Sequence, residues 1–450
     1  MGTRFHLVSL GCAKNTVDSE SMARLMDRAG FESTEDAGNA DVLIVNTCGF
    51  IGPAKEESLQ VLRELAEAKG SQQLLIAAGC LTQRYGAEIA EAVPGIDGIL
   101  GTRRWMDIVE VVQSLRSAKH PEPLYHLPAV ATVGEDERGI DRVAIQGPSA
   151  YLKIADGCRR PCAFCAIPLI KGTAVSRPMQ AILSEAQHLE ASGVRELILI
   201  AQDTTDYGHD LGLREGLADL LEQLVQKAPG IDWIRVMYAY PGYVTDRFIE
   251  AMASHPQILP YLDMPLQHGN RETLRRMRRP ANLEWVYSTI AKMRAAIPDL
   301  SLRTTFIVGY PGETEAEFQD LLDFITTIRF DRVGAFPFSF EPGTTSEVLG
   351  DPVAPELKQE RLDRLMTLQQ SISLQRNQEF VGRSLMTLIE GTKDGISLGR
   401  TYRDAPEVDG LVLIEGDIPV GEMLPVVITG AMPYDLTGQV ERVDRQVIRL

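Results

Sequence analysis

The sequence predicts an α/β fold in three parts: an N-terminal open α/β domain, a central partial (βα)6 barrel of the TIM type and a C-terminal antiparallel β-barrel of the OB type. Apolar strand-like runs alternate with helical patterns in the first part, and a strand-then-helix unit recurs about six times in the middle. After residue 382 short strands separated by Gly and Asp take over. A chain of 450 residues exceeds what one hydrophobic core usually organises. We expect domains at 1–117, 149–379 and 380–450, with a linker at 118–148.

The N-terminal domain is predicted from three compact apolar runs and two helical patterns. The runs cover residues 5–10, 41–46 and 74–78 and end in Gly, Cys or Asn, as buried parallel strands do. Residues 19–29 and 53–68 carry helical spacing. Beyond residue 117 the periodicity is lost and prolines gather, which is typical of a connector.

The barrel is predicted from six βα units, because repeated right-handed units of this length build a parallel barrel or partial barrel. We expect strands at 151–155, 196–201, 233–238, 261–264, 302–308 and 333–338. The helical patterns lie at 179–191, 213–226, 245–253, 283–296 and 315–328, and a long helix at 355–379 closes the unit. The last barrel should contain strands at 384–389, 411–414, 424–429 and 439–443.

Charge and cysteine content narrow the class of protein. The formal net charge of −17 repels phosphate backbones at long range and favours a basic partner. The sequence has no uncharged apolar run of about 18 residues, so we expect no membrane span, and its first apolar stretch is too short for a signal peptide. We therefore expect a cytoplasmic protein. Six cysteines in such a chain are too few for a disulfide scaffold, which favours metal binding or catalysis.

Three of the cysteines form a Cys-x3-Cys-x2-Cys loop directly after the first barrel strand: Cys158, Cys162 and Cys165. Three thiolates in one loop can hold three corners of an iron-sulfur cubane and leave its fourth iron open. A structural zinc site would need a fourth ligand, and no Cys or His lies near in sequence. Three buried core cysteines are a further alternative, which the polar residues of the loop disfavour. Active sites of parallel barrels lie at this end of the strands.

The other three cysteines, Cys12, Cys48 and Cys80, each follow a predicted strand of the first domain directly. Because parallel strands end at the same edge of a sheet, we expect these side chains to converge there. A second three-thiolate cluster with an open iron is the resulting hypothesis. The alternative is that each is a small buried hydrophobic residue.

These features resemble the radical S-adenosylmethionine (SAM) methylthiotransferases, whose N-terminal three-cysteine domain, radical SAM barrel and TRAM β-barrel would cover essentially the whole chain. The sequence is most similar to the branch that modifies an aspartate of the twelfth protein of the small ribosomal subunit. The matching stretches lie at residues 9–15, 17–20, 175–178, 202–204, 265–268, 399–400 and 404–410.

The resemblance implies two [4Fe-4S] clusters and SAM as cofactors. Cys158, Cys162 and Cys165 would hold the radical SAM cluster, and Cys12, Cys48 and Cys80 the auxiliary cluster. SAM on the first cluster would yield a radical that removes an unactivated hydrogen, a step beyond any side-chain acid or base. The auxiliary cluster would hold the sulfur to be transferred. No catalytic side chain is assigned beyond the two clusters.

The family places SAM near the motif that ends the fifth barrel strand, and five residues are assigned to SAM binding: Gln202, Asp203, Arg303, Gly309 and Gly312. For the glycine motif, the start of a helix is the competing role. For Asp203 it is capping of the next helix. A neighbouring histidine, His268, ends the fourth strand and is either part of the site or a structural residue.

The C-terminal domain favours a protein substrate. It contains seven basic and eleven acidic residues, a net charge of −4, whereas a barrel that grips RNA should be basic. The partner implied is a basic small-subunit ribosomal protein, with an electron donor such as flavodoxin or ferredoxin. The alternatives are a transfer RNA adenosine methylthiotransferase and a non-catalytic iron-sulfur electron carrier or ribosome-binding module. A basic run at residues 275–279 either contacts RNA or is a solvated helix face, and the second is favoured.

Overall fold

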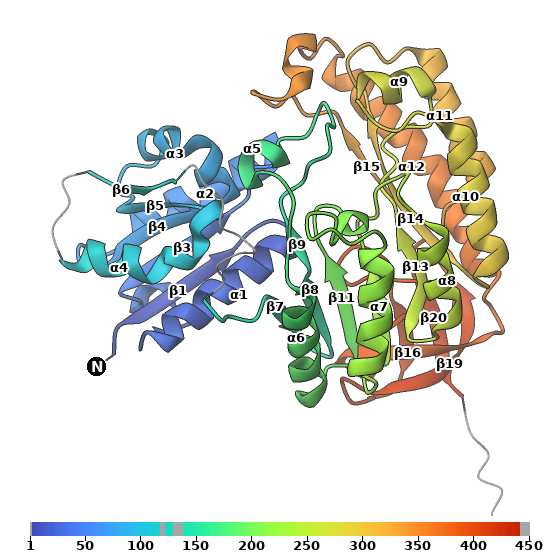
Figure 1. Cartoon of the computed structure of the whole chain (residues 1–450), viewed down its shortest axis with the longest axis horizontal. Helices are drawn as coiled ribbons and strands as arrows, with labels where there is room; N and C mark the ends of the chain where they lie inside the picture. Colours follow the sequence, from blue (N-terminus) through green and yellow to red (C-terminus); the bar gives the residue numbers. More distant parts are fainter. Residues whose placement is uncertain (1, 118–121, 129–137, 442–450) are drawn as a thin grey trace, which may run out of the picture.

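The N-terminal domain is a parallel sheet covered by helices (Figure 1, blue). The computed structural model describes residues 2–117, 122–128 and 138–441. The strands pair in the order β2-β1-β3-β4-β5-β6: β1 Arg4–Ser9, β2 Glu32–Ser33, β3 Val42–Thr47, β4 Leu74–Gly79, β5 Gly98–Gly101 and β6 Leu124–His126. The helices are α1 Ala13–Arg28, α2 Gly52–Ala68, α3 Cys80–Ala92 and α4 Ile108–Ser117. The three predicted strands are confirmed, and β2, β5 and β6 are additional.

The first helix begins six residues earlier than the apolar spacing predicts. Its first turns are polar, yet Asn15 and Asp18 are buried, with 3% and 1% of their surface exposed. Asn15 donates through its amide to the carbonyl of Leu10, at 2.6 Å. Because polar groups fill these buried positions, the helix start lies outside the reach of hydrophobic periodicity.

The central sheet has six parallel strands in the order β15-β14-β13-β12-β11-β8, and β7 pairs antiparallel with β8. Its strands are β7 Val143–Gln146, β8 Ser149–Lys153, β11 Glu196–Ile200, β12 Trp233–Val236, β13 Ile258–Asp263, β14 Ser301–Val308 and β15 Arg332–Pro337. The covering helices are α6 Met179–Ala191, α7 Gly216–Lys227, α8 Asp246–Ser254, α10 Leu283–Ala296, α11 Glu315–Ile328 and α12 Pro355–Gln378, with the short α5 Ile167–Lys171 and α9 Arg271–Arg276. β9 Ala155–Asp156 and β10 Val175–Ser176 form a small separate pair. The sheet ends at β15 and β7 without closing, so the partial barrel is confirmed.

The predicted connector contributes a strand to each sheet. β6 extends the first sheet, and β7 lies at the edge of the second. Residues 118–121 and 129–137 of the predicted connector lie outside the described residues. The exact domain boundaries stay a prediction.

The C-terminal domain is a closed five-stranded barrel in the order β16-β17-β18-β20-β19. Its strands are β16 Ser384–Lys393, β17 Ile396–Thr401, β18 Val412–Glu415, β19 Met423–Ala431 and β20 Leu436–Val440. Pairing is antiparallel except between β18 and β20, which run parallel, so one pair differs from the antiparallel expectation. β17 was not predicted, because its buried side chains include the polar Ser397, Arg400 and Thr401. The predicted strand at 439–443 begins earlier than expected, and residues 442 and 443 lie outside the described part.

In Figure 1 the N-terminal domain lies to the left of the central barrel, and the C-terminal barrel lies below it. One apolar cluster contains Tyr151 and Tyr261 of the central barrel together with Val17 of α1 and Leu388 of β16. Lys153, the last residue of β8, bonds to Asp18 of the N-terminal domain, so the C-terminal end of this strand faces that domain.

Buried charges join the N-terminal domain to the barrel. Asp18 of α1 accepts hydrogen bonds from Lys153 at 2.7 Å and Lys171 at 2.6 Å, and it also pairs with Arg142. Asp156 shares these cations, with its nearest contact at 2.6 Å to Lys153. Burial opposes ionisation of Asp18, but the three cations outweigh it and hold the pKa of the carboxyl well below its usual range. Two carboxylates and three cations thus form one buried network between the domains.

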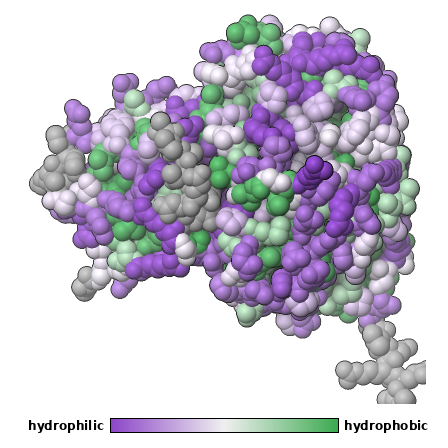
Figure 2. Space-filling model, in the orientation of Figure 1, coloured by the Kyte–Doolittle hydropathy of each residue, from purple (hydrophilic) through white to green (hydrophobic). Residues whose placement is uncertain are grey.

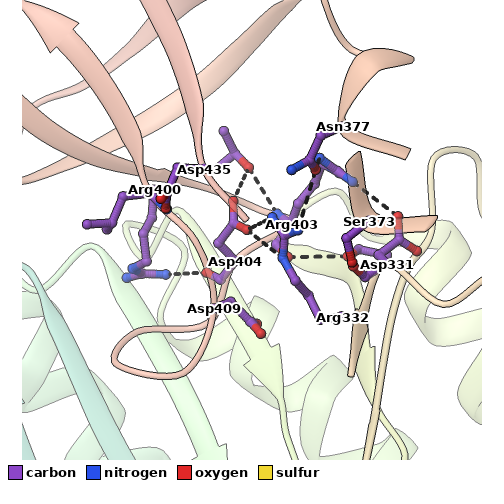
Figure 3. A network of polar contacts seen from close by, with 12 residues as sticks. Asp331, Arg332, Ser373, Asn377, Arg400, Arg403, Asp404, Asp409 and Asp435 are labelled. Carbon is purple, nitrogen blue, oxygen red and sulfur yellow. Dashed lines mark hydrogen bonds and ion pairs between the residues drawn. The ribbon is translucent and has the colours of Figure 1, made fainter. Parts of the chain in front are cut away.

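A second buried network joins the central and C-terminal barrels (Figure 3). Arg403 donates to Asn377 of α12 at 2.9 Å and to Asp331 at 3.1 Å. Arg332, at the start of β15, donates to Asp404 at 2.5 Å. These residues are all buried or nearly so. Because breaking any one pair would leave a buried charge without its partner, the network fixes how the two barrels meet.

The buried carboxylate of Glu196 makes the contact between the central and C-terminal barrels sensitive to pH. Arg400 donates to it at 2.5 Å and Arg235 at 2.7 Å. Burial raises the pKa of Glu196, but the two guanidinium groups outweigh it and lower the pKa to about 2. Because the pKa of Glu196 is lower in the folded protein, its ionised carboxylate stabilises the fold at pH values above about 4.3, the pKa of an unfolded glutamate. This stabilisation is lost as the pH falls toward 2.

We expect Glu196→Gln to lower the unfolding free energy by roughly 3 kcal/mol at pH 7 and by much less near pH 2, measured by urea denaturation. Glu222→Gln, which removes an exposed pair with Arg247, is the control and should cost under about 1 kcal/mol. An equal effect at both pH values would contradict this assignment.

The surface in view is mainly hydrophilic, with separate hydrophobic patches (Figure 2). One patch lies at the upper edge, where Figure 1 shows the orange segment that precedes α12. That segment includes the 3-10 helix Thr345–Leu349, in which Val348 is 88% exposed. Among the residues that the structure describes, none of the helices is both long and apolar enough to cross a membrane.

Candidate functional site

All six cysteines line one cavity of about 440 Å³ between the N-terminal domain and the barrel. Cys12, Cys48 and Cys80 come from the edge of the first sheet, and the loop of three cysteines comes from the barrel. The strand-end argument therefore places the dispersed cysteines correctly. The structure also brings the two sets to the same space, which their sequence positions did not indicate.

The first set is held by the ends of three neighbouring strands. Cys12 follows β1 at the start of α1, Cys48 follows β3, and Cys80 is the first residue of α3 after β4. Gly11 has a φ of 95°, and a Cβ at this position would lie 2.8 Å from the Cβ of Cys48. Only glycine fits there, so the backbone before Cys12 lies directly against Cys48.

The second set is fixed by contacts of its loop. The backbone N–H of Cys158 donates to the carbonyl of Gly172 at 3.1 Å, and that of Ala163 donates to Met277 at 2.8 Å. Arg279 lies with its Nη1 3.5 Å from the Cys162 sulfur, and the Tyr240 hydroxyl lies 3.8 Å from the same sulfur. Donors of this kind stabilise a thiolate and tune an iron-sulfur cluster.

The chemistry of the six sulfurs fits iron-sulfur clusters. Burial raises the pKa of Cys80 and Cys165 to about 12, and that of Cys158 to about 11. Burial also raises the pKa of Cys48. Buried thiols of this kind stay protonated at neutral pH until a metal replaces the proton. Thiolate is the usual ligand of such clusters, and the cavity encloses two sets of three.

A site for one metal ion is a different arrangement. Within the described ranges, no group of three or more His, Cys, Asp or Glu side chains stands close enough to hold a single ion. The three thiolates of a cubane bind three different irons, so they lie farther apart than the ligands of one ion.

The residues assigned to SAM fall into two groups. Gln202 and Arg303 line the cavity, and the Oε1 atom of Gln202 is buried without a hydrogen-bond partner in the described structure. Asp203 pairs with Arg160 at 2.6 Å and is not among the described residues that line the cavity.

The two glycines assigned to SAM are also absent from the described residues that line the cavity. The N–H of Gly309 donates to the Glu313 carboxylate at 3.1 Å. A Cβ on Gly309 would lie 2.4 Å from Cγ of Lys358 in α12. Close packing of the helix accounts for this glycine.

His268 and the basic run have structural contacts. His268 is fully buried, and its Nδ1 accepts from the N–H of Asn270 at 2.9 Å. In the basic run, Arg275 pairs with Glu272, and Arg276 pairs with Glu317 at 2.9 Å. Two of the four arginines of the run are thus paired with carboxylates, and Arg279 lies at the cavity.

Several cavity residues were not predicted. Lys14 and Tyr238 line it from opposite domains, with the lysine Nζ 3.1 Å from the centre of the tyrosine ring. Tyr240, Arg279 and Phe336 also line it. Lys14 lies two positions after Cys12, and this is the one signal in the sequence that pointed to it. The others lie in the barrel and come from segments far apart in the sequence, so local patterns do not mark them.

Comparison with known proteins supports the class that the fold and the cysteine loop indicate, a radical SAM protein. Residues 152–325 match the Radical SAM superfamily, residues 4–101 the Uncharacterized protein family UPF0004 and residues 381–440 the TRAM domain. The fold is similar to that of a radical S-adenosylmethionine methyltransferase, TsrM, from Kitasatospora setae, with a TM-score of 0.57. That match covers 79% of this chain and 80% of the other, at 14% identity.

Two relatives are similar over almost their whole length. The ribosomal protein uS12 methylthiotransferase RimO of Chloroflexus aurantiacus is 50% identical, over 97% of this chain and 99% of the relative. The protein of the same name from a Roseiflexus species is 48% identical, over 97% of each chain. The chain belongs to the RimO family of ribosomal protein uS12 methylthiotransferases.

Proposed function

We propose that this protein converts a specific aspartate of ribosomal protein uS12 to 3-methylthioaspartate by radical SAM chemistry. The observation that carries the proposal is the single cavity with all six cysteines, in a chain of this family. Two sets of three thiols on two different domains give two cluster sites facing one space. The transfer of a group from one site to a carbon activated at the other requires this proximity.

The proposal assigns a role to each set. Cys158, Cys162 and Cys165 hold a [4Fe-4S] cluster that binds SAM, and Cys12, Cys48 and Cys80 hold an auxiliary [4Fe-4S] cluster for the sulfur. Together with SAM these groups supply the one-electron chemistry that replaces an unactivated C–H hydrogen, which side chains alone do not perform.

The protein's own residues position and enclose the reaction. Arg279 and Tyr240 donate toward the Cys162 sulfur and orient that side of the loop. Gln202 and Arg303 are the proposed SAM contacts, since both face the cavity with polar groups. Arg303 is held by Asp263 at 2.9 Å, which fixes its direction. The largely apolar wall, with Phe164 and Phe336 among its residues, excludes water from reactive species.

The C-terminal barrel supports a protein substrate over transfer RNA. Its described basic residues are Arg383, Lys393, Arg400 and Arg403, and two of these, Arg400 and Arg403, are buried in ion pairs. Arg383 pairs with Asp299. Within the described part of the barrel, that leaves Lys393 as the one cation for which the structure shows no carboxylate partner. RNA binding would require several free cations, whereas a basic ribosomal protein does not.

The proposal also includes an electron donor, a cellular location and the boundaries of the domains. The electron donor is a flavodoxin or ferredoxin, and the location is the cytoplasm. The domains are residues 1–117 for the auxiliary cluster, 149–379 for the radical SAM barrel and 380–450 for the TRAM barrel. A second pocket is lined by Arg159 and Arg160 of the cysteine loop, which pair with Asp206 and Asp203, and by Arg278 and Arg279. The basic residues at this pocket support an acidic donor.

We expect the anaerobically reconstituted protein to bind about eight irons per chain, as two cubanes require. With SAM and flavodoxin it should add a CH2S unit to uS12 and leave transfer RNA unchanged, as measured by mass spectrometry of both. Addition to transfer RNA alone would overturn the substrate, and about four irons would overturn the two-cluster assignment.

A further inference from the structure

One cation in the cavity makes no ion pair with any residue that the structure describes. Five basic side chains line the cavity, and three of them are paired: Arg160 with Asp203 at 2.6 Å, Lys171 with Asp18 at 2.6 Å and Arg303 with Asp263 at 2.9 Å. The fourth, Arg279, is directed at the Cys162 sulfur. Lys14 is the fifth, and it makes no hydrogen bond or ion pair with any described residue. Its ammonium therefore has N–H donors for which no described residue supplies an oxygen acceptor.

The position of Lys14 is fixed by both domains. Its backbone lies in the first turn of α1, two residues after Cys12. Its ammonium rests on the ring of Tyr238, 3.1 Å from the centroid, at the end of β12 in the barrel. Tyr238 has a φ of 63°, which is rare for a bulky residue and is found where the surrounding structure imposes it. Its N–H donates to Asp263 at 3.2 Å, which holds this backbone in place.

We propose that Lys14 binds the side-chain carboxylate of the target aspartate. This inference rests on the proposed function, which supplies an aspartate as substrate. A half-buried ammonium that makes no ion pair with a described residue gains a charge-assisted hydrogen bond when a carboxylate enters. The adenine of a transfer RNA brings no carboxylate, so this contact also selects between the two substrate classes.

The contact positions the reacting atom as well. The β-carbon of aspartate is bonded directly to the carboxyl carbon, so a carboxylate fixed at Lys14 leaves that carbon little freedom. Lys14 follows Cys12 in the chain, and Tyr240, which contacts Cys162, lies two residues after Tyr238. The carboxylate site therefore lies between the two sets of cysteines. Lys14 is a positioning and specificity residue, because it holds the substrate without taking part in bond breaking.

The experiment compares two peptides on the reconstituted protein. Both carry the target segment of uS12, one with its aspartate and the other with asparagine at that position. We expect the wild-type protein to bind the aspartate peptide about tenfold or more tightly, the range of one hydrogen bond to a charged group. Lys14→Met should reduce this preference to about onefold, and Lys14→Arg should keep part of it. Binding is read by fluorescence anisotropy, independently of turnover.

Controls separate this contact from other effects. Lys55→Met removes another lysine that lies over a tyrosine ring in the same domain, 3.8 Å from Tyr85 and outside the cavity, and should keep the full preference. The preference is a ratio measured on one preparation, so partial loss of cluster cancels. Should Lys14→Met fail to fold, Tyr238→Leu removes the support of the ammonium and should lower the same ratio. An unchanged ratio in the variant that folds would overturn the proposal, and so would a raised KM for SAM without a change in ratio. Binding of neither peptide by the wild type would overturn the proposed function itself.

Discussion

The Cys12→Ala variant should lose methylthiolation of uS12 and retain SAM cleavage, whereas Cys158→Ala should lose both reactions. Each variant removes one thiolate from one of the two sets that face the shared cavity. In the proposed roles SAM is cleaved at the cluster held by Cys158, Cys162 and Cys165, so only the second variant should affect that step. The sulfur would be supplied from the cluster held by Cys12, Cys48 and Cys80, so either variant should reduce transfer to background.

The measurement is quantification of 5′-deoxyadenosine and of modified uS12 in the same reaction. Iron content gives a matched check, because each variant should bind about four irons in place of about eight. Loss of SAM cleavage in a folded Cys12→Ala protein that keeps its barrel cluster would contradict the division of roles.

The largest expected effect on stability comes from Asp18. In the Asp18→Asn variant three buried cations, Arg142, Lys153 and Lys171, lose one of the two carboxylates that they share and keep Asp156. Removing one partner from a buried ionic network costs about 3–5 kcal/mol. We expect a loss of this size at pH 7, measured by calorimetry. Glu20→Gln on the exposed side of the same helix is the control, with an expected change within about 0.5 kcal/mol.

The pH dependence of this loss has a definite sign. The pKa of Asp18 is held below its ordinary value, so its contribution is present above about pH 4 and disappears as pH falls further. The wild-type protein and Asp18→Asn should therefore converge in acid. A difference that persists unchanged at pH 2 would show that the lost stability comes from packing.

Much of the fold follows from apolar periodicity, and its failures have a common cause. Strands such as β3 and β4 are continuous apolar runs, and both were predicted. β5 has only four residues with glycine at each end, so it gives almost no pattern. β17 and the first turns of α1 bury polar groups such as Arg400 and Asp18, whose partners lie far away in the sequence. Pattern rules assume that buried residues are apolar, and these positions break that assumption.

The site residues that could be predicted from the sequence are also those marked by a local pattern or by strand order. The spacing of Cys158, Cys162 and Cys165 is local, so the sequence alone marks them as a set. The convergence of Cys12 and its partners follows from parallel strand order. The contact of Lys14 with Tyr238 depends on how two domains pack together. The spacing of residues along the sequence does not predict that packing. Gly309 is an ambiguous site signal, because close packing on α12 requires the same residue type as ligand approach, and its assignment to SAM binding stays a prediction.

The network around Asp18 also has a consequence for how the chain folds. Lys171 follows Asp18 by 153 residues, and Lys153 follows it by 135. Contacts of such high sequence separation form late, since a long stretch of chain must be ordered before they contribute stability. The first sheet depends on local pairings and should form early. The cavity with the six cysteines closes only when the barrel has folded against the N-terminal domain. During synthesis, therefore, the edge with Cys12, Cys48 and Cys80 is exposed to solvent before its opposite wall exists.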